Sequence, residues 1–158
     1  MRSENSVARA GVDPAFRARL LANGRAACEE LGITFYDDTQ LLVLENTDTV
    51  QHLIVCTLCS CYPRPVRGLP PDWDKLKPYR ARAVQEPSVL LAAFGTVIPA
   101  HVAIHVSDST ALVRSLVLPQ RPEGTEHLSE EQLASLVTRA AMIGVVKATI
   151  RETKETAP

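Results

Sequence analysis

The positions of apolar residues along the chain predict four strands. Residues 41–44 and 50–55 are short runs of Val, Leu and Ile separated by polar turn residues, which predicts strand, turn, strand. Apolar and less apolar residues alternate through 102–106, and another apolar run follows at 112–118 after a polar turn. These last two segments predict a hairpin.

A first helix is predicted from Asp13 to about Leu31. The Asp13 side chain can accept from free backbone N–H groups, and Pro14 has no N–H to leave unpaired, so the pair is a good helix start. Gly32 is expected to end the helix. Cys28 lies at helical spacing from apolar residues, so it is predicted to be a small core residue rather than a ligand.

Two further helices are predicted from their terminal residues. Residues 86–94 begin with Glu-Pro and are followed by Gly95, which predicts one helix with a glycine stop. Ser129 and Gln132 have the spacing of a capping box, which predicts the start of another helix that continues to about Arg139.

The chain is expected to form one α+β domain. Its 158 residues match the commonest domain size. Strands and helices mix without regular alternation, and no Gly-rich phosphate loop is found, so a doubly wound sheet is not favoured. Dense prolines predict a rigid, irregular loop over residues 61–78. We expect an N-terminal arm at 1–12, the domain at 13–146 and a charged tail at 147–158.

Composition excludes several classes of protein. Hydrophobic residues make up 46% of the chain and charged residues 22%, which is typical of a globular protein. The net charge is -1 and the 17 Lys and Arg residues are scattered, so a nucleic-acid partner is not expected. The sequence has no apolar run long enough for a membrane span and no secretory signal, so we expect no membrane association and a cytoplasmic location.

Three of the four cysteines fall within six positions, at Cys56, Cys59 and Cys61. Such crowding suits metal binding better than a disulfide framework. If Cys59 and Cys61 bind one ion, the backbone nitrogens of Ser60 and Cys61 lie between the two sulfurs and can complete a flat array. Cys56 then approaches from one axial side and leaves the opposite position open. This electron-donating set favours a trivalent, octahedral, low-spin ion, and an open position on a Lewis acid is where a substrate binds.

Two other kinds of metal site are alternatives for the same segment. A structural zinc site would use the three cysteines with His52 as the fourth ligand, but Cys-x-Cys crowding is poor for a closed tetrahedral site. An iron–sulfur cluster lacks a fourth cysteine at suitable spacing. Spacing alone therefore supports a metal site without fixing a reaction.

The segment Cys56-Thr57-Leu58-Cys59-Ser60-Cys61 resembles the metal-binding motif of nitrile hydratase alpha subunits and of the related thiocyanate hydrolase subunit. The resemblance covers nearly the whole chain. It continues through Tyr62-Pro63, Gly68-Leu69-Pro70-Pro71, Trp73, Tyr79-Arg80-Ala81-Arg82, Glu86-Pro87, Val117-Leu118-Pro119-Gln120-Arg121-Pro122, Gly124-Thr125-Glu126 and Ile143-Gly144-Val145. It implies a layered α-β-β-α domain with a shortened N-terminal helical arm, as in a split multi-subunit variant such as toyocamycin nitrile hydratase.

The resemblance also implies a ligand set. The thiolates of Cys56, Cys59 and Cys61 and the amide nitrogens of Ser60 and Cys61 would hold low-spin cobalt(III), with iron(III) as the alternative. Thr57 corresponds to the cobalt form of the motif. Cys59 would be oxidised to a sulfinic acid and Cys61 to a sulfenic acid, as low-pKa, metal-bound thiolates permit.

The implied reaction is the lyase-type hydration of a small nitrile to its amide, with Cys59 and Cys61 as catalytic residues. Either the Cys61 sulfenate oxygen or an activated water would attack the nitrile carbon. Expected partners are one or more beta-type subunits, whose arginines would contact the oxidised sulfurs, and a metallochaperone that loads cobalt. Hydrolysis of thiocyanate and a non-catalytic zinc-binding module are the alternatives. Arg64, Arg67, Arg80 and Arg82 could assist at the metal or be ordinary surface charges.

Overall fold

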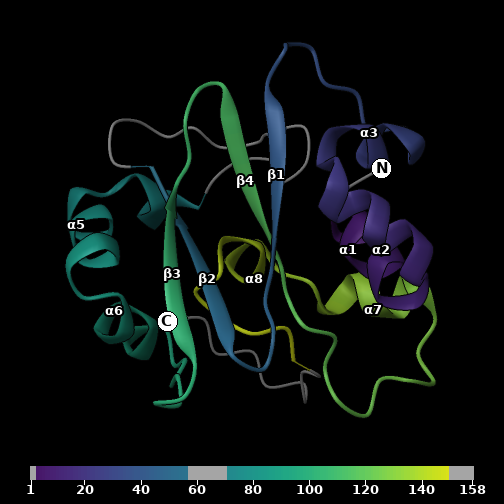
Figure 1. Ribbon diagram of the computed structural model, residues 1–158. Helices are drawn as coiled ribbons and strands as arrows, with labels where there is room; N and C mark the ends of the chain where they lie inside the picture. Colours follow the sequence, from purple (N-terminus) through teal and green to yellow (C-terminus); the bar gives the residue numbers. More distant parts are fainter. Residues whose placement is uncertain (1–2, 57–70, 150–158) are drawn as a thin grey trace.

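The computed structural model describes residues 3–56 and 71–149 (Figure 1). Its helices and strands confirm the α+β class. The helices are α1 (Ser3–Val12), α2 (Pro14–Ala22), α3 (Gly24–Glu30), α5 (Lys77–Gln85), α6 (Pro87–Ala93), α7 (Glu130–Leu136) and α8 (Arg139–Ile143), with a 3-10 turn η1 (Asp72–Lys75). The strands are β1 (Gln40–Glu45), β2 (Val50–Val55), β3 (Ala103–Asp108) and β4 (Val113–Leu118). No helix within these ranges is long and apolar enough to cross a membrane.

The strands form two parallel pairs, which contradicts the predicted hairpin. β1 pairs with β4 and β2 pairs with β3. The reason is that consecutive strands serve different cores. Ile104 and Val106 of β3 pack with Leu53 of β2, whereas Leu116 of β4 belongs to the other core, with Val43 of β1. Alternation in a sequence indicates which face of a strand is buried but not which strand lies beside it.

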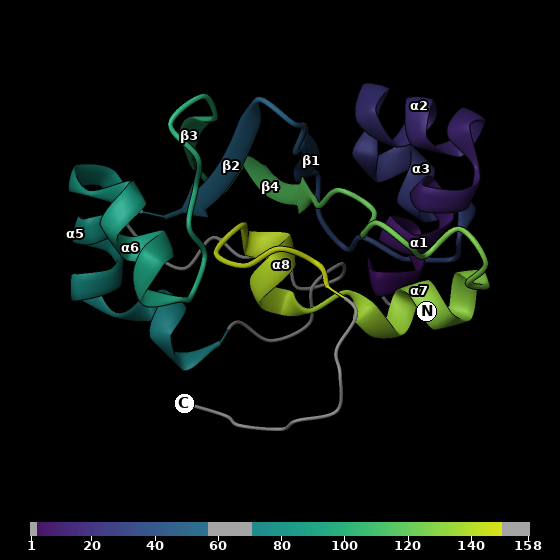
Figure 2. The same cartoon turned by 90° about the horizontal axis from the view of Figure 1, so that it is seen from below.

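Helices α1, α2 and α3 lie on one side of the strands and α5 and α6 on the other (Figure 1), and a hydrophobic core lies under each group. The first lies under α1, α2 and α3 and contains Phe16 and Leu20; the second lies under α5 and α6 and contains Leu90 and Leu91. Helix α8 joins them, because Met142 packs in the first core and its neighbour Ile143 in the second. Figure 2 shows α8 beneath the strands, between the two groups of helices.

The segment predicted as one helix from Asp13 to Leu31 is two helices with a break at Asn23. The start is confirmed, since Asp13 Oδ1 accepts from the backbone nitrogens of residues 15 and 16 at 3.0 Å. Asn23 ends α2 and caps α3 by accepting from Ala26 N at 3.1 Å. Gly24 follows the break, and a Cβ at this position would lie 2.6 Å from Leu41 O of β1. The break therefore lets α3 approach β1 closely.

The other predicted helix ends are largely confirmed. The capping box of Ser129 and Gln132 is present at the start of α7. That helix ends at Leu136 rather than near Arg139, because Thr138 caps a new helix, α8, by accepting from Ala141 N. Helices α5 and α8 were not predicted. Gly32 and Gly95 follow helices with φ of 77° and 81°, as expected for glycine stops.

Helix α1, which covers most of the expected N-terminal arm, contributes to the core. Val7 and Ala10 of α1 are buried in the first core, and Arg9 pairs with Glu130 of α7 at 3.2 Å. The proposed division into an arm at 1–12, a domain at 13–146 and a tail at 147–158 stays a prediction.

Candidate metal centre

The carboxyl end of β2 leads directly to Cys56. Val55, the last residue of β2, lies opposite Asp108 at the end of the parallel strand β3. The chain after β3 continues this pairing, since Ser109 N donates to Val55 O at 2.7 Å. Cys56 is half-buried. The carboxyl ends of two parallel strands therefore lead to Cys56, and such ends are where α/β proteins commonly bind ligands.

Helix α5 anchors β2 just before Cys56. The Tyr79 hydroxyl donates to Ile54 O at 3.0 Å in a buried position. Tyr79 is itself packed, with its ring 4.9 Å from that of Trp73 and 6.5 Å from that of Phe94. A buried hydrogen bond to a carbonyl is costly to lose. The aromatic cluster of Trp73, Tyr79 and Phe94 thus fixes the backbone that delivers Cys56.

The other predicted ligands, Cys59, Ser60 and Cys61, lie outside the described residues, as do Arg64 and Arg67. Within the described part of the chain, no group of three His, Cys, Asp or Glu residues is placed to hold a metal ion. The ligand set predicted from the sequence therefore stays a prediction. A half-buried thiol at a strand end suits it, because thiolates are the soft donors that such ions prefer.

Cys28 confirms the opposite prediction, that it is a core residue. It is fully buried in the first core among apolar side chains. Burial raises the pKa of its thiol to about 11, because the apolar surroundings disfavour the charged thiolate. A thiol in this environment stays protonated at neutral pH, so Cys28 is a poor metal ligand.

The geometry disfavours the zinc site in which His52 would be the fourth ligand. β2 is extended from Val50 to Val55, so the Cα atoms of His52 and Val55 are about 10 Å apart and Cys56 lies beyond. The His52 and Cys56 side chains, together with zinc bonds of about 2.1 Å and 2.3 Å, would have to reach across more than this distance. The His52 ring instead contacts that of His105, with centroids 5.6 Å apart.

The electrostatic environment of His52 keeps it neutral. Burial lowers its pKa, and the neighbouring His105 lowers it further. His52 Nδ1 is buried and has no hydrogen-bond partner among the described residues. His101, His105 and His127 are exposed.

Two of the basic residues near the motif are described. Arg80 lies beside Tyr79 on α5 and is half-buried, whereas Arg82 is exposed. A role for either near oxidised sulfurs stays a prediction. The sequence reasoning missed the positioning roles of Tyr79 and of the β3 end, because it missed both helix α5 and the parallel pairing of β2 with β3.

Comparison with known proteins identifies one family. The family model described as "Nitrile hydratase, alpha chain" matches residues 1–146. The low-molecular weight cobalt-containing nitrile hydratase subunit alpha of Rhodococcus rhodochrous is 55% identical over 139 residues, which cover 88% of this chain and 67% of that protein. The thiocyanate hydrolase subunit gamma of Thiobacillus thioparus is 41% identical over 150 residues, which cover 88% of this chain and 62% of that protein.

A solved structure agrees with these relatives. The chain is similar to a double mutant of the Fe-type nitrile hydratase from Comamonas testosteroni Ni1, with a TM-score of 0.89 and 42% sequence identity. The match covers 99% of this chain and 76% of that one. The similarity therefore extends over the whole fold.

Proposed function

Because the chain belongs to the nitrile hydratase alpha-chain family, we propose that it is the subunit that carries the metal, and that the metal is cobalt. It is the alpha subunit of a hetero-subunit enzyme, nitrile hydratase. The proposed reaction is hydration of a small nitrile to the corresponding amide. One observation carries the proposal: β2 delivers Cys56, the first cysteine of the motif, to the shared end of two parallel strands.

The proposed ligands are the thiolates of Cys56, Cys59 and Cys61 and the backbone nitrogens of Ser60 and Cys61. All five come from one short segment of chain, so the position of the whole set depends on where that segment begins. Cobalt(III) at this set would supply a Lewis acid that draws electron density from the nitrile carbon.

The residues around β2 would keep the ligand segment in place. Tyr79 holds Ile54 O, and Ser109 N holds Val55 O. Both bonds fix the backbone within two residues of Cys56. A metal site requires its supporting contacts to be as well ordered as its ligands. We therefore assign Tyr79 and the end of β3 a positioning role.

Cobalt is proposed over iron for two reasons. The relative from Rhodococcus rhodochrous is named as cobalt-containing and shares more of its sequence with this chain than the Fe-type protein from Comamonas testosteroni does. Thr57 also stands at the motif position whose residue distinguishes the two forms in the family. Iron(III) is the alternative.

A beta-type subunit is the proposed partner, since an alpha chain implies a beta chain. Arginines from that subunit would balance the negative charge of the oxidised Cys59 and Cys61. A metallochaperone for cobalt loading is also proposed. This chain alone is expected to have little nitrile hydratase activity.

Metal content and product formation test the proposal together. The chain is produced with a family beta subunit in cobalt-supplemented medium, and the complex is assayed for bound metal and for amide formed from a nitrile. We expect about one cobalt per alpha chain, and a Cys56→Ser variant that loses the metal. Cys28→Ala is the matched control, because it also removes a thiol but leaves the ligand set intact. Full cobalt in the Cys56→Ser variant would contradict the ligand assignment.

The identity of the substrate is tested on the same complex. Thiocyanate hydrolysis is the second candidate, supported by the 41% identity to the thiocyanate hydrolase subunit gamma. The higher identity of 55% to a nitrile hydratase subunit favours nitriles. Turnover of thiocyanate without any hydration of nitriles would reverse this choice. One zinc per chain and no cobalt would instead favour the non-catalytic module.

A further inference from the structure

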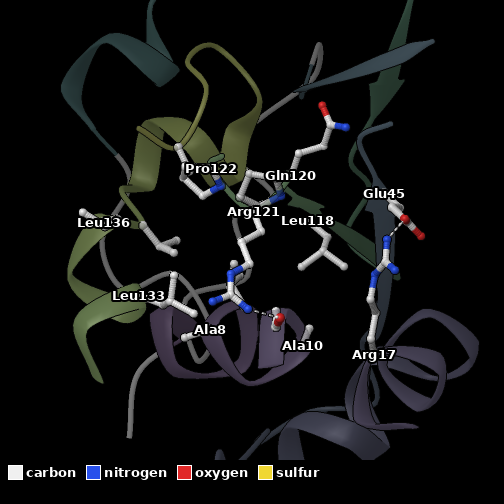
Figure 3. A pocket seen from close by; sticks show the side chains of 15 residues that line it. Ala8, Ala10, Arg17, Glu45, Leu118, Gln120, Arg121, Pro122, Leu133 and Leu136 are labelled. Atoms are coloured by element: carbon white, nitrogen blue, oxygen red, sulfur yellow. Dashed lines mark hydrogen bonds and ion pairs between the residues drawn. The ribbon is translucent and has the colours of Figure 1, made fainter. Parts of the chain in front are cut away.

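A cavity of about 260 Å³ lies between α1, α7 and the segment that follows β4 (Figure 3). It adjoins Glu45 at the end of β1 and Leu118 at the end of β4. β2 begins only a short turn after Glu45 and ends before Cys56. The cavity therefore lies at the opposite end of β2 from Cys56, the first of the proposed metal ligands.

About half of the cavity wall is apolar. Helix α7 contributes Leu133 and Leu136, and α1 contributes small residues such as Ala8 and Ala10. Figure 3 shows these side chains around the Arg121 guanidinium, with Leu118 on the other side. Ligand pockets typically combine an apolar lining with a few polar groups that orient the ligand. The volume is slightly below the roughly 300 Å³ at which such pockets usually begin, so a small molecule would fit.

Arg121 brings a positive charge into this cavity without an acidic partner. Its guanidinium donates to Gly11 O at 2.9 Å, to Thr125 Oγ1 at 3.1 Å and to Thr125 O at 2.5 Å. All three acceptors are uncharged oxygens, and no ion pair between described residues involves Arg121. Arg17, the other guanidinium at the cavity, is paired with Glu45. The charges of that pair offset each other, so the cavity keeps about one positive charge, that of Arg121.

The three hydrogen bonds leave donors available on Arg121. A guanidinium has five N–H groups, and these bonds use one on Nε, one on Nη1 and one on Nη2. One N–H remains on each terminal nitrogen. A carboxylate oxygen can accept from each of these N–H groups, and such charge-assisted bonds are the strong ones.

We propose that this cavity binds a small monocarboxylate with an aliphatic body, its carboxylate on Arg121 and its chain against α1 and α7. The single uncompensated charge suits a monoanion. A dianion such as phosphate would leave a net negative charge in the cavity, because Arg121 supplies only one uncompensated positive charge. A neutral apolar molecule would leave the guanidinium without a counter-charge.

Hexanoate and hexanamide are the probes that test this site. They have the same shape, but only hexanoate is charged. Binding to the full chain, prepared without added metal so that neither probe can bind a metal ion, is followed by ligand-observed NMR. We expect saturable binding of hexanoate with a Kd of about 1 mM or below, typical of a small ligand. Hexanamide should bind at least about tenfold more weakly, because it loses the charge-assisted bonds.

Variants at Gly11 test where the probe binds. A Cβ at Gly11 would lie 3.9 Å from both Arg121 Cδ and Leu133 Cδ1, so there is space for a side chain beside the cavity. Gly11→Leu should fill the cavity and weaken hexanoate binding by at least about tenfold, whereas the matched control Gly11→Ala should change it by less than about threefold. Thermal melting checks that both variants fold.

Three results would overturn the proposal. They are equal binding of hexanoate and hexanamide, unchanged hexanoate binding in the folded Gly11→Leu variant, and the lack of any saturable hexanoate binding to the wild-type chain. Because the measurement needs neither metal nor nitrile turnover, it succeeds or fails independently of the proposed function.

Discussion

Replacement of Gly144 is predicted to destabilise the protein more than replacement of a matched glycine. Gly144 ends α8 with a φ of 98°, and a Cβ there would overlap the carbonyl oxygen of His52 and lie 3.2 Å from Leu53 Cα. Both neighbours are backbone of β2, which cannot rotate away as a side chain can. The same contact is reinforced by Gln51 Nε2, which donates to Gly144 O at 2.8 Å.

Gly95 provides the control, because it also follows a helix with a positive φ, 81°, but a Cβ there would meet nothing within 4 Å. Alanine in this backbone conformation costs about 1–2 kcal/mol at either position. At Gly144 the overlap with β2 should add about 1–3 kcal/mol, the usual cost of overpacking. Gly144→Ala should therefore lower the free energy of unfolding by about 2–5 kcal/mol and Gly95→Ala by about 1–2 kcal/mol.

Urea unfolding of the full chain, followed by circular dichroism, measures the difference. For a domain of this size, each kcal/mol also corresponds to about 2–4 °C in Tm. Asparagine tolerates a positive φ better than alanine. Gly144→Asn and Gly95→Asn therefore reduce the cost of the backbone conformation at both positions, and only Gly144→Asn keeps the overlap with β2. Equal free energies of unfolding for the two Asn variants would refute the close contact between α8 and β2.

Three further predictions follow from other contacts. Gly24→Ala should destabilise the chain by about 1–3 kcal/mol, because the alanine Cβ would lie 2.6 Å from Leu41 O. Urea unfolding measures this effect, and a stabilised variant would contradict the close packing of α3 on β1. Tyr79→Phe removes the hydroxyl that donates to the buried carbonyl of Ile54 in β2. The variant should lower the free energy of unfolding by about 1–3 kcal/mol and should also lower cobalt occupancy. Unchanged values of both would contradict the positioning role of Tyr79. Burial and, to a smaller extent, His105 lower the pKa of His52, so the native state binds a proton at His52 less readily than the unfolded chain does. The native state therefore keeps its full stability above pH 6.5 and loses part of it as the pH falls below 6.5. His52→Gln should therefore lose less stability than the wild type on acidification below pH 6.5, as followed by melting temperature, and equal losses would count against this account.

The sequence determined those features that depend on neighbouring residues. Asp13 caps a helix because its side chain reaches backbone N–H groups two and three residues away. The box of Ser129 and Gln132 forms for the same reason. The buried position of Cys28 followed from helical spacing. The family could likewise be identified from the motif that begins at Cys56, since its cysteines lie within one short segment.

Only the tertiary structure decided which distant segments lie side by side. β3 pairs with β2 rather than with β4, and the helix expected to continue to Leu31 breaks at Asn23 so that Gly24 can approach β1. The bond from Arg121 to Gly11 O joins residues 110 positions apart. Contacts of this kind arise when apolar faces from different parts of the chain share a core, and the alternation of residues within one segment carries no information about its partner.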